Sequence, residues 1–218
     1  MTQPRPDAAQ RMIEATIQLI EAEGVGKVTV RAVAAAAEVN IAAVSYHFGG
    51  KRGLVAAALE GSIRHMVADS ETYLARLPAE PAALTELLGY MLEGSLRYPR
   101  LTQAHLHAPL VSGDFSGPFP VLLQPLMVTL RDRLRELVPG LRKPEAGRRV
   151  VAAMSAVLYP ASFDAVFEGL RALGDARSRR AYAEELAEAA VRPVARTATG
   201  TEAANASISI SSGRHRHK

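Results

Sequence analysis

Apolar residues recur at helical spacing along most of this 218-residue chain. A first stripe predicts a helix over about residues 7–23 that ends at Gly24, and it consists of Met12, Ile13, Ile17 and Ile20. A longer stripe from Val55 to Leu74 predicts one helix over about residues 51–77, because Pro78 cannot continue it.

Proline and glycine punctuate the rest of the chain. The stripes between them predict helices over about residues 81–98, 100–110, 118–138, 144–173 and 175–193. Pro120 and Pro125 indicate that the third of these is broken or starts late, and Pro160 indicates a kink in the fourth. Since no β-type alternation of any length precedes residue 196, we expect an all-α fold with about nine helices.

The segment between the first two stripes has the pattern of a helix-turn-helix. Thr29 is a good N-cap for an Ala-rich helix over residues 30–37, and Asn40 is a good N-cap for a second helix over residues 41–48. Only residues 38–40 are left for the turn. With the first helix of the chain, this pair predicts a three-helix head.

The second helix of the pair has a small outer face. Ile41, Ala42, Ala43 and Ser45 can enter a DNA major groove, which is about 12 Å wide, without a clash. Tyr46 and His47 follow them and can donate hydrogen bonds to phosphates. The pattern therefore predicts a DNA-binding head.

At these residues the chain resembles the TetR family of bacterial one-component transcription regulators. The resemblance rests on the run VRAVA, the turn ending in Val39-Asn40, and the string AAVSYHFGGKRGL with its Lys51 and Leu54. Glu38 stands where the family commonly has Gly, and Gly50 stands where Ser often caps the next helix. The resemblance implies a homodimeric regulator, most often a repressor, that a small molecule releases from a palindromic operator.

The expected DNA contacts follow from the motif. Arg31 is the candidate for a guanine contact, with a plain phosphate contact equally open, and Asn40 either contacts DNA or only caps. The full set is Thr29, Arg31, Asn40, Ile41, Ala42, Ala43, Ser45, Tyr46, His47 and Lys51.

Composition narrows the class of protein further. The chain has no cysteine, which excludes disulfides and thiolate metal sites, and no apolar run approaches the roughly 20 residues of a membrane span. We therefore expect a cytoplasmic protein without membrane contact. The net charge of +4 suits a polyanionic partner, but residues 1–55 hold six Lys or Arg against five acids, so charge alone does not locate the DNA site.

The helical body carries the expected effector site. The resemblance implies a pocket there, and the scarcity of charges among its apolar positions favours a hydrophobic or aromatic effector, with no cofactor. Candidate lining residues are Met66, Tyr73, Met91, His105, Phe115, Phe119, Met127, Tyr159 and Phe163.

Small residues on the last two helices predict the mode of assembly. Two such helices from each subunit form the four-helix dimer interface that the resemblance implies, while an intramolecular core built from the same residues stays open. The small residues are Ala152, Ala153, Ser155, Ala156 and Ala161 on one helix and Ala183, Ala187 and Ala190 on the other. Val150, Val157, Leu158, Tyr182 and Leu186 are interspersed among them.

An enzyme or metal-binding protein built in the body is the alternative function, and His105 and His107 are its candidate residues. Two residues apart on a helix are about 200° apart around its axis, so both side chains cannot bind one ion. No HExxH, phosphate-binding Gly motif or nucleophile elbow is present. A dimer that has lost DNA readout is a further alternative, because of Glu38 and Gly50.

The expected organisation has three parts. Residues 1–52 form the DNA-binding head, residues 53–195 form the ligand-binding and dimerisation body, and residues 196–218 form a disordered tail rich in Thr, Ser, Ala and Gly.

Overall fold

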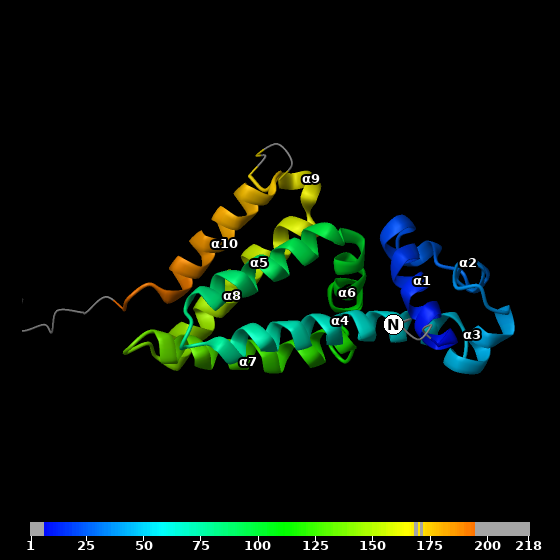
Figure 1. Ribbon diagram of the computed structural model, residues 1–218, viewed down its shortest axis with the longest axis horizontal. Coiled ribbons are helices and arrows are strands. Elements are labelled where there is room, and N and C mark those ends of the chain that lie inside the picture. Colours follow the sequence, from blue (N-terminus) through cyan, green and yellow to red (C-terminus); the bar gives the residue numbers. More distant parts are fainter. Residues whose placement is uncertain (1–6, 168–169, 171, 195–218) are drawn as a thin grey trace, which may run out of the picture.

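The computed structural model describes residues 7–167, 170 and 172–194, and the expected tail over residues 196–218 lies outside them (Figure 1). The described residues form helices and no strand, which confirms the all-α prediction. The helices are α1 (Ala8–Glu23), the 3-10 turn η1 (Val25–Lys27), α2 (Val30–Ala36), α3 (Ile41–Phe48), α4 (Lys51–Arg76), α5 (Ala82–Arg97), α6 (Pro99–Ser112), α7 (Pro118–Leu137), α8 (Lys143–Ser162), α9 (Asp164–Phe167) and α10 (Ala176–Val191).

The head consists of α1, α2 and α3, and the long helix α4 leads from it into the body (Figure 1). Each of the three head helices is capped by the polar residue that precedes it. Asp7 Oδ1 accepts from the backbone N–H of Gln10 at 2.7 Å, Thr29 Oγ1 from that of Ala32 at 3.1 Å, and Asn40 Oδ1 from that of Ala42 at 2.8 Å. The caps start each head helix where the sequence predicts it.

Two predictions for the body helices are wrong in detail. The helix α7 is continuous, because Pro118 and Pro120 fall in its first turn, where backbone N–H groups have no helical partner, and Pro125 is accommodated inside it. The helix α8 ends at Ser162 instead of continuing to residue 173, since Phe163 leaves the helical region at φ −134° and ψ 45°. The short helix α9 follows, and Asp175 caps α10 by accepting from the backbone N–H of Ser178 at 2.8 Å.

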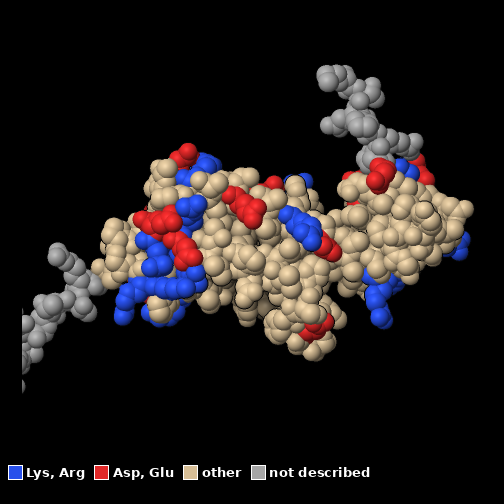
Figure 2. Space-filling model, turned by 90° about the horizontal axis from the view of Figure 1, so that it is seen from below, with Lys and Arg blue, Asp and Glu red and all other residues tan. Residues whose placement is uncertain are grey.

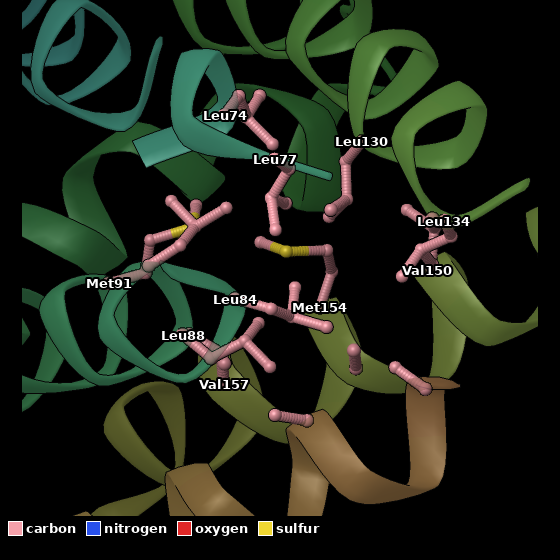
Figure 3. Packing of buried hydrophobic residues seen from close by; sticks show 14 of the residues in the cluster. Leu74, Leu77, Leu84, Leu88, Met91, Leu130, Leu134, Val150, Met154 and Val157 are labelled. Carbon is pink, nitrogen blue, oxygen red and sulfur yellow. The ribbon is translucent and has the colours of Figure 1, made fainter. Parts of the chain in front are cut away.

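The body has one hydrophobic core, to which α4, α5, α7, α8 and α10 contribute. Figure 3 shows Leu84 and Leu88 of α5, Leu130 of α7 and Met154 of α8 pointing into it. The contribution of α10 is made by alanines, of which Ala183, at 1% exposure, lies 3.7 Å from where a Cβ on Gly89 would sit. Gly89 and the alanines therefore let α10 and α5 approach closely.

The head has a separate core, and helix α6 of the body takes part in it. Leu101 and Ala104 of α6 are buried with residues of α1, α2, α3 and α4, including Met12, Val33 and Val44. None of the helices in the described ranges combines the length and apolarity that crossing a membrane requires.

Reciprocal hydrogen bonds join α6 to α1. The Glu21 carboxylate Oε2 accepts from the backbone N–H of Leu101 at 3.0 Å, in the first turn of α6. In return, Arg100 Nη1 donates to the backbone carbonyl of Ala22, near the end of α1. Glu21 thereby provides an acceptor for a backbone N–H at the start of α6, and Arg100 provides a donor for a backbone carbonyl near the end of α1. Helix ends leave such groups without a partner inside the helix.

Candidate nucleic-acid interface

Helix α3 is held by its inner face and presents its outer face to solvent. Val44 is fully buried, whereas Ile41 is 52% and Tyr46 86% exposed, and Ala42 and Ser45 are exposed beside them. At 100° per residue these four side chains cover about 140° of the helix surface. Gly49, at φ 67°, ends the helix, and its N–H donates to the carbonyl of Ser45 at 3.0 Å.

The turn between α2 and α3 requires a left-handed residue. Glu38 has φ 54°, a conformation that costs a residue with a Cβ about 1 kcal/mol relative to glycine. The turn geometry is nevertheless formed, and the backbone N–H of Val39 donates to the carbonyl of Ala34 at 3.0 Å.

Exposed basic side chains come from the segments that precede and follow the helix-turn-helix or lie within it. Lys27, Arg31, Lys51 and Arg52 are all exposed, and none of them forms an ion pair with a carboxylate in the described part of the chain. Figure 2, which views the head from the side of α3, shows a largely uncharged face with both Lys or Arg and Asp or Glu at its edges. Lys27 and Arg52 were not among the sequence candidates, although each adjoins a helix end of the motif.

Most of the residues predicted to contact DNA are exposed on the head. Ala43 and Lys51 differ from the others. Ala43 is half-buried and packs against the head core, so it offers less surface than Ala42. Lys51 Nζ donates to the backbone carbonyl of Gly26 at 3.4 Å and so also ties α4 to η1. His47 is exposed, with its ring edge-on to Tyr46 at 5.0 Å.

The predicted effector-binding residues do not form one site. Met91 belongs to the body core, and Met66, Tyr73 and Met127 pack against it. Phe115 is exposed and lines a shallow surface groove of about 320 Å³ with Pro120, Val121 and Gln124. Tyr159 and Phe163 contact each other at 4.6 Å on the outside of the body, with half or nearly half of each side chain exposed.

His105 and Phe119 lie together between α4, α6 and α7. Their rings stack at 5.5 Å, and Nε2 of His105 is 2.9 Å from the Ser62 hydroxyl of α4. Burial lowers the pKa of His105 to about 4, so the imidazole is neutral at physiological pH. His107 is exposed, and no three side chains of metal-binding type cluster in the described residues.

A second groove, of about 420 Å³, lies between α5 and α10. Its arginines are engaged: Arg179 pairs with Glu93 at 2.5 Å and Arg180 with Glu184 at 3.0 Å. At one end Tyr90 donates to Asp69 Oδ2 at 2.6 Å, and burial, followed by this bond, raises the pKa of Tyr90. The two arginines of this groove are therefore already neutralised by glutamates and are not available to pair with a charged ligand.

The small-residue faces of α8 and α10 divide between the core and the surface. One set is buried within the chain, as the intramolecular alternative requires: Val150, Ala153, Val157, Ala161, Ala183, Ala187 and Ala190. Leu158, Ala156, Leu186 and Tyr182 are half-buried. On the outer side of α8, Ala152 and Ser155 are exposed between Val151, at 65% exposure, and Tyr159, at 51%.

The comparisons with known proteins agree with this geometry. Residues 12–58 match the family model for bacterial regulatory proteins of the tetR family. No curated protein matches the chain.

Solved structures share the fold at low sequence identity. The fatty acid degradation regulator FadR from Bacillus halodurans is similar with a TM-score of 0.64 at 13% identity, over 87% of this chain and 97% of that one. A transcriptional regulator FadR from Bacillus subtilis, solved in complex with stearoyl-CoA, gives 0.63 at 13%, over 84% and 97%. A TetR-family transcriptional regulator from Streptomyces coelicolor gives 0.60 at 19%, over 86% and 92%.

The family match covers the helix-turn-helix and the start of α4, and the structural similarity extends the shared architecture through the body. The DNA-binding head therefore matches the tetR family of bacterial regulatory proteins over residues 12–58, and the chain as a whole shares its fold with solved transcriptional regulators.

Proposed function

We propose that the protein is a homodimeric, cytoplasmic, DNA-binding transcriptional regulator, and that a small hydrophobic or aromatic molecule releases it as a repressor from a palindromic operator. The observation that carries the proposal is the outer face of α3. It is exposed and carries no charged side chain, and the head also exposes Lys27, Arg31 and Arg52, which form no ion pair with a carboxylate among the described residues. This is the arrangement that a major groove and its flanking phosphates accommodate.

The test of DNA reading is fluorescence-anisotropy binding to DNA from upstream of the protein's own gene, against a scrambled duplex, at two salt concentrations. We expect binding at least about a thousandfold tighter to the first, as is typical of specific sites. Equal and salt-sensitive binding to both duplexes would contradict sequence-specific recognition of the upstream DNA by the protein.

Two variants separate the roles within the head. Tyr46→Phe should weaken binding to all sequences alike, since its hydroxyl is expected to contact a phosphate. Arg31→Ala should relax preference at one position in each half-site, as loss of a guanine contact does, by about 1–3 kcal/mol. Equal loss on every sequence would make Arg31 a phosphate contact only.

Dimerisation is supported by the outer sides of α8 and α10. Val151, Ser155, Tyr159 and Phe163 form an exposed stripe on and just after α8, in which every side chain except that of Ser155 is largely apolar. On α10 the charges are segregated: Arg177 and Arg180 precede Glu184, Glu185 and Glu188.

A two-fold axis would set the basic half of one α10 against the acidic half of its partner, so the surface is complementary to itself. Two heads would then reach half-sites about 34–36 Å apart. Sedimentation showing one 23.3 kDa species at micromolar concentration would contradict the dimer. Val151→Glu should produce that monomer, while Val121→Glu, at a comparably exposed valine of α7, should not.

The effector site is proposed where α4, α6 and α7 meet, at Ser62, His105 and Phe119. Helix α6 packs mainly on α1 and α8, so it can separate from α7 without disrupting the body core. Residues 101–130 contain no Lys or Arg, which favours an uncharged effector. The Bacillus subtilis FadR structure, solved in complex with stearoyl-CoA, shows that a protein of this fold can bind a ligand with a long apolar acyl chain, although the CoA group of that ligand is charged.

The division into a head over residues 1–52 and a body over residues 53–195 remains part of the proposal. Two helices link them. Any effector that moves α6 would act on the head directly through Arg100 and Leu101, in addition to acting through α4. Coupling of this kind is typically about 1–3 kcal/mol.

A further inference from the structure

The outer face of α3 lacks every side chain that discriminates bases by paired hydrogen bonds. Such readout uses Arg or Lys on guanine, Asn or Gln on adenine, and Asp or Glu on cytosine. Helix α3, Ile41–Phe48, contains none of these residues. Its only polar side chains are Ser45, Tyr46 and His47.

Asn40 and Ser45 do not supply the missing readout. Asn40 stands just before the helix, but its Oδ1 accepts from the backbone N–H of Ala42 at 2.8 Å. A bidentate adenine contact needs both Oδ1 and Nδ2 directed at the base, whereas the cap already uses Oδ1 and holds it at the backbone of α3. Ser45 lies near the centre of the exposed face, and a serine hydroxyl both donates and accepts, so it serves any base.

Apolar surface is what this face does offer. Ile41 is 52% exposed, and Ala42 is exposed beside it in the first turn. The first turn of a recognition helix is the part that reaches base edges. The 5-methyl group of thymine is the one apolar feature of the major-groove edges.

We propose that Ile41 and Ala42 select operator half-sites by contacting thymine 5-methyl groups, so that methyl contacts carry the base discrimination made by α3. The proposal rests on the proposed DNA-binding function. The ligand it specifies is duplex DNA with thymine at two positions in each half-site, opposite the first turn of α3. Arg31 lies outside α3, so a guanine that it contacts would be at a different position.

The expected size of the effect follows from the burial of methyl groups. Burying one methyl contributes about fourfold in affinity. Two residues on each of two heads make four contacts, which multiply to about 200-fold. Replacing thymine by uracil removes only this methyl and leaves all base-pairing and hydrogen-bonding groups in place.

The experiment is a selection of binding sites from a randomised duplex library, prepared once with thymine and once with uracil in its place, using the full-length protein. We expect the thymine library to converge on a two-fold motif with fixed thymines. The selected duplex, resynthesised with uracil in the half-sites, should bind about 200-fold more weakly. Uracil in the flanks should have no effect.

Placing the same 5-methyl group on cytosine provides a second, independent test. Each fixed thymine is replaced by cytosine or by 5-methylcytosine, with guanine opposite in both cases. We expect the methylated duplex to bind more tightly, by about fourfold for each methyl. Equal binding of the two would overturn the proposal.

Two protein variants complete the design. Ile41→Ala should lower the thymine-to-uracil affinity ratio by about fourfold in each half-site, and because Ile41 is exposed the head should still fold. His47→Gln, on the same helix but outside this face, should weaken binding and keep the ratio. An unchanged ratio in the Ile41 variant would contradict its role.

The outcomes separate the inference from the function on which it rests. Convergence of both libraries on the same motif with equal affinity would overturn methyl readout and leave the regulator proposal intact. Convergence of neither library would contradict sequence-specific DNA binding itself.

Discussion

The neutral state of His105 should make the stability of the fold depend on pH. Burial among α4, α6 and α7 lowers the pKa of this imidazole from 6.5 to about 4. The perturbation is a change from pH 7.5 to pH 5.0, compared between the wild type and His105→Gln, whose side chain is uncharged throughout.

The sign and size follow from the two pKa values. At pH 5.0 an unfolded His105 is mostly protonated, whereas the folded one is mostly neutral, so the unfolded state binds more protons and is favoured. The contribution of His105 is therefore complete above pH 6.5 and lost as the pH falls toward 4. At pH 5.0 the loss is about 2 kcal/mol, from 1.36 kcal/mol for each pKa unit.

Urea denaturation followed by far-UV circular dichroism measures the effect, since the chain has no tryptophan. At equal protein concentration, the wild type should lose about 2 kcal/mol more than His105→Gln between the two pH values. His107→Gln, two residues along α6 and exposed, should behave like the wild type. Equal pH dependence in the wild type and His105→Gln would refute the reasoning.

Two further predictions concern the head. Glu38→Gly should be more stable to urea than Glu38→Ala by about 1 kcal/mol, because both remove the side chain but only glycine relieves the positive φ; equal stability would show that the turn is not strained. Glu21→Ala should cost about 1 kcal/mol by removing the acceptor for the Leu101 N–H, whereas Glu23→Ala at the same end of α1 should cost little. Equal losses for the two variants would mean that the reciprocal cap of α1 and α6 does not contribute.

Local signals made the head predictable. Thr29 and Asn40 act within three residues of their own positions, so their caps can be recognised without knowing the tertiary structure. The same holds for Asp175 at the start of α10. Pro120 misled because the effect of a proline depends on its position: in a first turn a missing N–H costs nothing.

The body was less predictable because its organisation depends on long-range packing. The end of α8 at Ser162 coincides with no glycine or proline. The effector candidates were chosen as apolar or aromatic residues, a property that core, groove and surface residues share, and the structure distributes them among all three. Only His105 and Phe119 meet away from the body core and next to a polar group from another helix.

The participation of α6 in the head core bears on how such proteins can be cut and recombined. A chain ended after the first turns of α4 would expose the surface of α1 that Leu101 and Ala104 cover, and would leave the Glu21 carboxylate without its backbone partner. A chimaera that carries the head of a relative would therefore fold only if the first two turns of α6 were taken from the same relative as the head. The head as a folding unit is therefore discontinuous along the sequence, because it includes the start of α6. We expect substitutions in α1 and at the start of α6 to co-vary among relatives.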